Sequence, residues 1–378
     1  MTEWREQKLS DFMDFNPYTP LSKGIIAKKV TMEKLIPFNR KIQGYEDAVF
    51  SGGTKFKNGD TLVARITPCL ENGKTAYVDF LNDEEVAFGS TEFIVLRAKE
   101  GISDSRFIFY FAISDEFRDT AIQLMSGTSG RQRVDTEALK RKVFTLPPLP
   151  EQKAIAEVLS SLDDKIDLLT RQNKTLEDLA QAYFRKWFIE DIHNKICYKR
   201  FADVAEFSKG KKPREIIEEQ RKGYVRQILI DTFDTDKEYY TRPEGMIIST
   251  ETDILMVMDG ASSGRVEIGF SGVVGSTIGM FRPKSDFKYP MFLYEFLKSN
   301  EEFIMDNTTG SAIPHADKKL IFELEIPYFQ EEKIQEFENF ALVLFNKRQN
   351  NRRQIRTLTK LRDTLLPKLI SGEIRVKM

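Results

Sequence analysis

The sequence predicts an α+β protein in which one unit, a globular domain followed by a long helix, occurs twice along 378 residues. Three observations support this fold class: short β-rich segments in each half, a heptad-patterned segment after each half, and ordered similarity between the halves. We expect two α/β globular domains related by an approximate twofold axis and separated by two long antiparallel, coiled-coil-like helices.

The similarity between the halves is weak at each place but keeps its order along the chain. The matched segments are KLSDFMDF (8–15) with RFADVAEF (200–207), GDTLVARIT (59–67) with TDILMVMDG (252–260), NGKTAYVDF (72–80) with SGRVEIGF (263–270), FGSTEFIVLRAK (88–99) with VGSTIGMFRPK (274–284), SGTSGRQRVDTEALK (126–140) with TGSAIPHADKKL (309–320), and LPEQKAIAEV (149–158) with FQEEKIQEF (329–337). We therefore expect a first globular domain at 1–146, a first spacer helix at 147–192, a second globular domain at 193–326 and a second spacer helix at 327–378.

Within each globular copy, alternating β-rich runs predict strands and longer apolar runs predict one helix. The expected strands are 61–67, 75–80 and 86–96 in the first copy, and 254–258, 266–268 and 273–282 in the second. The expected helices are 105–125 and 290–306. Pro290 suits a first helical turn, where its missing N–H leaves no hydrogen bond unmade.

The segments after the two copies carry apolar residues at alternating spacings of four and three, which is typical of a coiled-coil seam. Pro150 favours a helix start there. The first seam is interrupted by Asn173 and the second by Arg348 and Asn351, and buried polar residues at such positions fix register at some cost in stability. Pro367 is expected to end or kink the second helix, with Gly372 as a cap. The economical arrangement pairs the two helices within one chain.

Composition excludes several classes of protein. The chain has 57 basic and 58 acidic side chains, a net charge of −1, whereas a free-standing nucleic-acid-binding domain is usually basic. Two cysteines and two histidines, far apart, argue against a disulfide framework and a metal site. The longest apolar run is FIFYFAI (107–113), too short for a bilayer, and no secretory signal begins the sequence. We expect a cytoplasmic protein without membrane contact.

The sequence shows no recognisable active site. FNPYTP (15–20) invites comparison with the Asn-Pro-Pro-Tyr/Phe motif of amino-methyltransferases, but it lacks the second adjacent proline and a Gly-rich cofactor loop, so a simple turn is the stronger interpretation. DGASSG (259–264) lacks the Gly-Lys-Ser/Thr of a phosphate-binding loop.

Two matching loops are the better candidates for a binding site. SGTSGRQRV (126–134) combines hydroxyl side chains with Arg131, Gln132 and Arg133, which can make bidentate contacts to guanine or adenine edges. The matching TTGSAIPHAD (308–317) offers different side chains. Lysines of GGTKFKNG (52–59) and SKGKKPR (208–214) are candidate phosphate contacts, although solvated charged turns explain any one of them equally well. The candidate DNA-binding residues are Lys55, Lys57, Arg65, Lys74, Thr128, Ser129, Arg131, Gln132, Arg133, Lys209, Lys211, Lys212, Arg214, Ser263, Arg265, Thr309, Ser311 and His315.

A second set of candidates lies on the helices. The aromatics Tyr183, Phe184, Trp187 and Phe188 are expected to face outward and look excessive for one contact between two helices, so we expect a partner to cover some of them. The second helix carries a basic run that includes Arg352, Arg353 and Arg356. Such a run is a solvated helix face about as often as a docking surface for an acidic partner or for DNA phosphates.

LPPLPEQKAIAEVLSSLDDKIDLLTRQNKTLEDLAQAYFRKWF (146–188) and LRDTLLPKLISGEIRV (361–376) resemble the central and C-terminal segments of type I restriction-modification specificity subunits. AFGSTEFIVLR (87–97) and NGDTLVARI (58–66) are similar to the core of their target recognition domains, and the likeness covers essentially the whole chain. IPYFQEEKI (326–334) departs from the family pattern, since it has one proline where the first copy has three.

The resemblance implies a chain without catalytic activity whose two domains each read half of a bipartite, interrupted site in double-stranded DNA. It also implies that the helices set the gap and recruit two modification (methyltransferase) subunits, to which restriction/translocase subunits bind. S-adenosylmethionine, ATP and Mg²⁺ would belong to those partners, with no cofactor in this chain. Partner subunits would complete the DNA channel, which makes the near-zero net charge intelligible. Two alternatives stay open: a coiled-coil protein-interaction scaffold without sequence-specific DNA binding, and a methyltransferase at FNPYTP.

Overall fold

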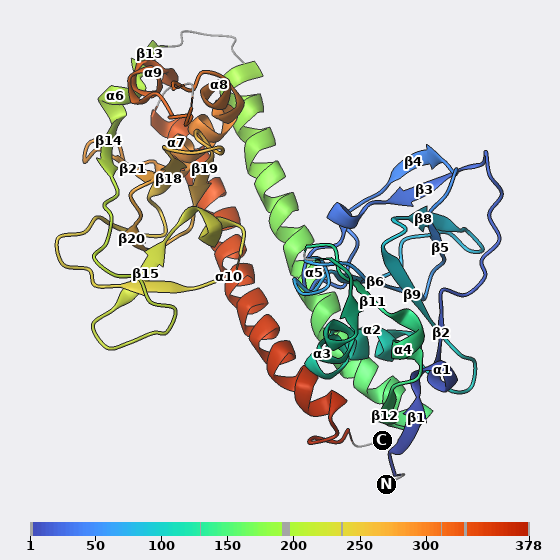
Figure 1. The fold of residues 1–378 in the computed structure, drawn as a ribbon. Coiled ribbons are helices and arrows are strands. Elements are labelled where there is room, and N and C mark those ends of the chain that lie inside the picture. Colours follow the sequence, from blue (N-terminus) through green and yellow to red (C-terminus); the bar gives the residue numbers. More distant parts are fainter. Residues whose placement is uncertain are drawn as a thin grey trace. The chain divides into compact units, whose positions relative to one another are not determined.

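The computed structural model describes residues 3–128, 130–190, 197–235, 237–310, 312–328 and 331–376. The chain divides into two compact units. Unit 1 comprises residues 1–167 and 357–378, and unit 2 comprises residues 168–356. Each unit therefore combines one globular domain with a segment from each of the two long helices (Figure 1).

Unit 1 is built on two four-stranded sheets. The order β2-β9-β6-β7 is antiparallel throughout, whereas β4-β3-β8-β5 contains one parallel pair, β3 with β8. The strands are β1 (Arg5–Lys8), β2 (Met13–Phe15), β3 (Ile26–Val30), β4 (Glu46–Val49), β5 (Thr54–Phe56), β6 (Thr61–Ala64), β7 (Thr75–Tyr77), β8 (Ala87–Gly89), β9 (Phe93–Ala98), β10 (Met125–Ser126), β11 (Arg133–Val134) and β12 (Val143–Leu146). The short helices are α1 (Leu9–Phe12), α2 (Ser105–Ile113), α3 (Asp115–Gln123), α4 (Thr136–Lys140) and the 3-10 turn Met32–Lys34.

Unit 2 repeats this plan. Its sheets have the orders β14-β21-β18-β19 and β16-β15-β20-β17, and the second again contains one parallel pair, β15 with β20. The strands are β13 (Cys197–Arg200), β14 (Ala205–Lys209), β15 (Val225–Ile228), β16 (Tyr239–Thr241), β17 (Ile248–Ser249), β18 (Ile254–Val257), β19 (Val266–Ile268), β20 (Gly272–Val274), β21 (Ile278–Pro283) and β22 (Glu325–Tyr328). The short helices are α6 (Phe201–Val204), α7 (Pro290–Ser299), α8 (Glu301–Asp306), α9 (Lys318–Glu323) and the 3-10 turn Ile230–Phe233.

The shared topology confirms the prediction that the chain contains one α+β unit twice. In both copies a short antiparallel pair, β1 with β12 and β13 with β22, joins the start of the globular domain to its end. Both copies also hold an ion pair with a buried carboxylate in the same place. Arg97 on β9 bonds Asp60 through two contacts of 2.6 Å, and Arg282 on β21 bonds Asp253 at 2.7 and 2.6 Å.

Two expected strands and two expected helices are each broken into a pair. The run 86–96 forms β8 and β9, which belong to different sheets, and 273–282 divides into β20 and β21 in the same way. The run 105–125 breaks at Ser114, whose hydroxyl accepts from the Phe117 amide and so caps a new helix, α3. The run 290–306 breaks at Asn300 into α7 and α8.

The long helices are α5 (Leu149–Arg185), which continues as a π-helical turn to Glu190, and α10 (Glu331–Ile370). Pro150 lies in the first turn of α5, as its lack of an N–H favours. Pro367 does not end α10, because the helix continues for another three residues to Ile370. The cap prediction is confirmed: Gly372 has a φ of +77°, a left-handed conformation that glycine adopts without strain.

Both long helices contribute to the hydrophobic core of each unit. In unit 1 the core includes Ile155 and Leu159 of α5 together with Leu369 of α10. In unit 2 it includes Phe184 of α5 and Phe337 of α10. In both units the globular domain thus packs on two helix segments at once, and these segments run antiparallel.

In unit 1, α5 and α10 also meet through a buried polar contact. Arg362 Nη1 of α10 donates to Asp163 Oδ1 of α5 at 2.8 Å. The other oxygen of Asp163 accepts from the hydroxyl of Tyr110, on α2, at 2.7 Å. Each polar group that the helix contact buries therefore has a partner, which limits the cost of its desolvation.

In unit 2 a matching contact joins three groups. Arg348 of α10 lies 3.1 Å from Glu177 Oε2 of α5, and the Tyr294 hydroxyl of α7 donates to Glu177 Oε1 at 3.0 Å. One turn further along α10, the side-chain amide of Asn351 donates to Asn173 and Gln172, both at 2.9 Å. Asn173 and Asn351, which interrupt the two predicted seams, therefore meet, whereas Arg348 pairs with Glu177.

Candidate DNA interface

The loop predicted to read DNA in the first copy is anchored to the end of β6. Arg133 forms an isolated antiparallel bridge with Ile66, and the backbone amide of Thr67 donates to Gln132 O at 3.0 Å. The amide of Val134 donates to Arg65 O at 2.9 Å, while β10 pairs with β11 at the base of the loop. The loop base is therefore held by the sheet.

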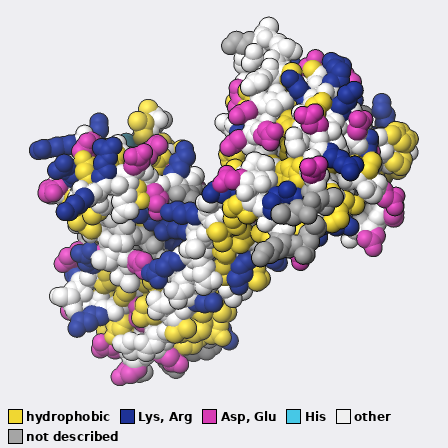
Figure 2. Space-filling model, turned by 90° about the horizontal axis from the view of Figure 1, so that it is seen from below, with side chains coloured by type: hydrophobic (Ala, Val, Ile, Leu, Met, Phe, Trp, Pro, Cys, Tyr) yellow, Lys and Arg dark blue, Asp and Glu magenta, His cyan; other side chains and the backbone are white. Residues whose placement is uncertain are grey.

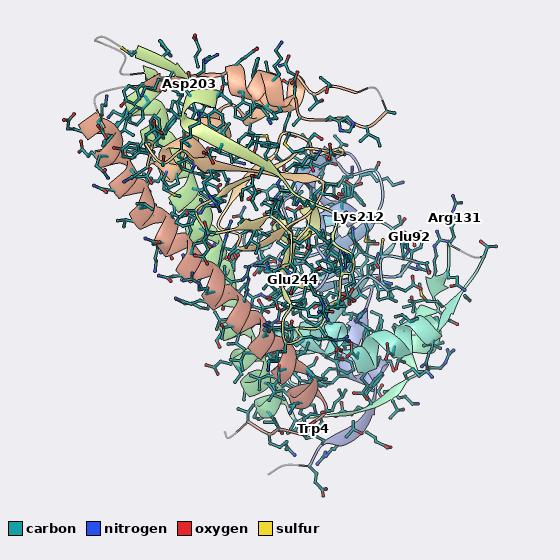
Figure 3. All side chains as sticks on the ribbon, turned by 90° about the vertical axis from the view of Figure 1, so that its left-hand side faces the viewer. Trp4, Glu92, Arg131, Asp203, Lys212 and Glu244 are labelled. Carbon is teal, nitrogen blue, oxygen red and sulfur yellow. The ribbon has the colours of Figure 1, made fainter. Side chains whose placement is uncertain are left out.

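The residues near the tip of this loop are solvent-exposed. Thr128, Arg131 and Arg133 are exposed, and Gln132 is partly buried. No ion pair or side-chain hydrogen bond joins Arg131 to the residues that the structure describes, and Figure 3 shows its side chain at the outer edge of the view. Ser129, another predicted contact, lies outside the described residues.

Arg133 is held by a carboxylate that the sequence analysis did not single out. Its Nε lies 3.0 Å from both oxygens of Glu92, and its Nη2 lies 2.6 Å from Oε1. These hydrogen bonds lower the pKa of Glu92 and raise that of Arg133, so both groups are charged. Arg65 lies 4.0 Å from the same carboxylate.

The loop of the second copy is anchored in the same way. His315 forms isolated antiparallel bridges with Asp259 and with Thr309. The amide of Gly260 donates to Pro314 O at 3.0 Å, and that of Ala316 to Met258 O at 2.9 Å. Ser311 lies outside the described residues.

The side chain of His315 is also held by a carboxylate. Asp259 Oδ1 lies 2.8 Å from His315 Nδ1, and Asp259 Oδ2 accepts from Lys209 Nζ at 2.8 Å. Burial opposes ionisation of Asp259, but the hydrogen bonds from Lys209 and His315 outweigh it and lower its pKa. Lys209 is thus engaged within the protein.

Arg133 and His315 occupy equivalent positions. Each forms a bridge with the residue two places beyond the last residue of an equivalent strand: Ile66 follows β6 and Asp259 follows β18. The two copies therefore present different side chains from one backbone frame.

Several predicted phosphate contacts surround a recess in unit 2. Lys211, Lys212, Arg214 and Arg242 line a recess of about 500 Å³ together with Glu215 and Glu244. Lys211 Nζ also donates to Gly245 O at 2.9 Å. Figure 3 labels Lys212 and Glu244 from this lining, and Figure 2 shows basic and acidic side chains interspersed on the face it draws. Four basic and two acidic side chains therefore share this lining, and Arg242 Nε lies 3.7 Å from Glu215 Oε1.

The lysines of unit 1 that were predicted to contact DNA have different surroundings. Lys57 is exposed and lines a recess beside Tyr18. Lys55 lies 5.5 Å above the ring of Tyr18 and 5.7 Å from that of Phe50. Lys74 Nζ instead donates to Met32 O at 3.0 Å, a contact that serves the fold.

Two other predicted DNA contacts need correction. Ser263 is 2% exposed, and its hydroxyl is 2.7 Å from Gly260 O and 2.8 Å from Pro314 O. The buried Ser263 hydroxyl therefore stabilises the loop by hydrogen bonding to its backbone. Arg265 makes a bidentate pair with Asp234, both contacts at 2.8 Å, and also bonds Glu267. Its hydrogen-bonding edges are occupied by carboxylates, so it stabilises unit 2.

The expectation that the aromatics of α5 face outward is wrong for two of the four. Phe184 and Phe188 are 0% and 1% exposed, because α5 packs on α7 as well as on α10. The Phe184 ring lies 5.4 Å from that of Phe292 and 5.6 Å from that of Phe337. Trp187 is half-buried beside this core, whereas Tyr183 is 39% exposed.

The three arginines predicted to bind a partner also differ from one another in their contacts with the rest of unit 2. Arg352 donates to Ile268 O at 3.0 Å and lies 5.1 Å from the ring of Phe270, and burial lowers its pKa. Arg353 pairs with both oxygens of Glu251 at 2.9 Å. Arg356 lines a shallow recess of unit 2 with Thr232. Arg352 is therefore corrected to a structural residue.

The FNPYTP segment forms the turn that leaves β2. The side-chain oxygen of Asn16 accepts from the Val95 amide at 2.9 Å, and the Asn16 amide donates to Val95 O at 2.8 Å. Asn16 thus continues the hydrogen bonding of β2 with β9.

Among the described residues, no group of three or more His, Cys, Asp or Glu side chains could hold a metal ion. The helices of that same part of the chain include none long and apolar enough to span a bilayer.

The fold and the paired loops define a class of protein with one recognition scaffold used twice and given two different sets of contacts. A family model described as "Type I restriction modification DNA specificity domain" matches residues 1–178 and again residues 194–351. The chain belongs to this family.

Two specificity subunits and one solved structure match this chain over most of its length. The type I restriction enzyme HindI specificity subunit of Haemophilus influenzae is 25% identical over 99% of this chain and 100% of its own. The MjaIX specificity subunit of Methanocaldococcus jannaschii is 27% identical over 74% of this chain and 71% of its own. The solved S subunit from M. genitalium has the same fold, with a TM-score of 0.62, 20% identity and coverage of 99% and 96%.

Proposed function

We propose that this chain is the DNA sequence-specificity subunit of a type I restriction-modification enzyme, and that its two globular domains each read one half of a bipartite site in double-stranded DNA. The observation that carries this proposal is the pair of equivalent loops. One backbone frame presents Arg133 in the first copy and His315 in the second, each oriented by a carboxylate. Two recognition loops with the same backbone arrangement and different side chains predict an interrupted site with two different halves.

The chemistry of the exposed groups suits DNA. Arginine can donate two hydrogen bonds to O6 and N7 of guanine, and glutamine can pair with adenine. Arg131, Gln132 and Arg133 supply such groups in the first copy. The lysines and arginines around the recess of unit 2 would contact phosphates, which positions a protein on DNA without reading its sequence.

Membership of the family supports a proposal for the partners and cofactors. The chain would recruit two modification subunits and, through them, restriction subunits, with S-adenosylmethionine, ATP and Mg²⁺ bound in those partners. The chain itself would carry no catalytic residue, in keeping with the structural use of Asn16 in FNPYTP. Tyr183 is the aromatic of α5 best placed to contact a partner, since its side chain is exposed beside the half-buried Trp187.

The test is a methylation map. The chain is co-expressed with the modification subunits of its host, and methylated adenines are located by single-molecule sequencing. We expect one interrupted motif. Exchanging residues 1–146 for another recognition domain should change one half of that motif, whereas inserting one heptad into α5 should change the gap alone.

The outcomes separate the alternatives. Complex formation with methylation that lacks any sequence preference would contradict the proposal and favour a coiled-coil scaffold. Methyl transfer by the purified chain alone would favour the methyltransferase alternative.

A further inference from the structure

We propose that Glu92 and Asp259 are positioning residues for sequence recognition: each fixes one edge of the side chain that meets the DNA, so that only the opposite edge reads a base. This inference rests on the proposed function and deepens it. It concerns two carboxylates that come from different places in the two copies, one from the loop between β8 and β9 and one from the residue that bridges His315.

The first carboxylate occupies a defined edge of its arginine. Glu92 takes the edge formed by Nε and Nη2 of Arg133, at 2.6 to 3.0 Å. A guanidinium has five N–H groups in a rigid plane, so the second edge, formed by Nη1 and the outer hydrogen of Nη2, stays available. That edge makes no hydrogen bond to the residues that the structure describes. It has the geometry for the O6 and N7 acceptors of guanine.

Glu92 is itself held in place. Its backbone amide donates to Ser90 Oγ at 3.1 Å, and its carbonyl accepts from the Arg65 amide at 2.9 Å. The side chain of Glu92 is about one-quarter exposed, whereas that of Arg133 is 43% exposed. The carboxylate therefore lies beneath the guanidinium, which is ordered before DNA arrives and loses less freedom on binding.

The second carboxylate acts on a ring. An ionised carboxylate only accepts hydrogen bonds, so its contact with His315 places a proton on Nδ1. The ring nitrogen left to meet DNA is then Nε2. Lys209 occupies the other oxygen of Asp259 and so holds the carboxylate in one orientation.

A direct reading role for Glu92 is the competing explanation, since glutamate can accept from the amino group of cytosine. A double-mutant cycle separates the two, because a residue that acts through Arg133 has no effect once Arg133 is gone. The variants are E92A, R133A and E92A/R133A. E46Q is the matched control, since Glu46 is an exposed glutamate of the same unit paired with Lys29.

The probe is a set of duplexes that carry the wild-type motif or one base substitution in it, methylated by the complex with its modification subunits. The readout is the ratio of methylation rates on the motif and on each substituted duplex. E92A should reduce discrimination by about tenfold at one base pair in one half-site. Discrimination at the other half-site should stay unchanged in E92A. E46Q should leave discrimination at both half-sites unchanged. E92A/R133A should match R133A.

Unchanged discrimination in E92A overturns the inference, as does an effect of E92A that persists in the R133A background. The wild-type complex must first yield an interrupted motif, and its absence would count against the proposed function instead. If E92A fails to fold, judged by the fluorescence of Trp4 in unit 1, E92Q takes its place, because it keeps the shape and removes the charge. D259N should by the same reasoning alter one position of the other half-site.

Discussion

Glu295, on α7 in unit 2, is a buried carboxyl group whose ionisation should contribute to the pH dependence of stability. It is 3% exposed, and its Oε2 has no hydrogen-bond partner among the described residues. Burial raises its pKa to about 8; Arg348 opposes this rise and Glu177 adds to it. Replacing Glu295 by glutamine keeps the shape of the side chain and removes the charge.

The magnitude and sign follow from proton linkage. Below pH 4.5 the carboxyl is protonated in the folded and unfolded chain, and its contribution does not vary. Between pH 4.5 and about 8 the unfolded chain releases the proton and the folded chain keeps it, so the free energy of unfolding falls as pH rises. At about 1.4 kcal/mol for each pH unit, the full fall is roughly 5 kcal/mol. Most of it should develop between pH 5 and 8.

The assay uses the two tryptophans of the chain. Trp4 belongs to unit 1 and Trp187 to unit 2, so a W4F background leaves Trp187 as the reporter of unit 2. Urea unfolding is followed by its fluorescence from pH 5 to pH 8.5. E295Q should gain stability over its parent by several kcal/mol across this range, whereas E302Q, at an exposed position of α8, should not. Parallel curves for E295Q and its parent would refute the reasoning.

Three further predictions test contacts of single residues. F184A should destabilise unit 2 by about 3–5 kcal/mol, since it empties a fully buried ring site, and a loss under 1 kcal/mol in the Trp187 assay would contradict the packing. R362M should cost unit 1 about 3–5 kcal/mol by leaving the buried Asp163 carboxylate without its cation, and D163N/R362M, followed by Trp4 fluorescence, should recover most of that loss. K212A should weaken binding of the whole complex to unrelated DNA and reduce the slope of log K against log salt by about one, and an unchanged slope would remove Lys212 from the phosphate contacts.

The sequence could reveal the repeat because buried strands and helix seams leave periodic apolar patterns. The sequence also showed that Asn173 and Asn351 interrupt the two seams, and the structure adds that these two side chains meet. The ion pairs Asp60–Arg97 and Asp253–Arg282, whose carboxylates are buried, are also visible in the sequence, since their residues stand in matched segments of the two copies, GDTL with TDIL and VLRAK with MFRPK.

Other features depend on contacts that spacing does not encode. A heptad pattern shows that one face of α5 is buried, but not that α7 covers a second face, so Phe184 was assigned to a partner. Glu92 lies more than 40 positions before Arg133 in the chain. The sequence around a carboxylate in a matched strand segment does not indicate which distant side chain it contacts. Strand breaks at Gly89 and before Ile278 reflect passage from one sheet to the other, which apolar runs conceal.

One ion pair between α5 and α10 in each unit has the same direction of charge. The carboxylate, Asp163 or Glu177, always comes from α5, and the guanidinium, Arg362 or Arg348, always comes from α10. Two identical descendants of a duplicated ancestor would each have to offer both signs. In this chain α5 supplies the acid and α10 the base of both ion pairs, so the two helices are not interchangeable at these positions, and an exchange of recognition domains that leaves α5 and α10 in place would keep both pairs.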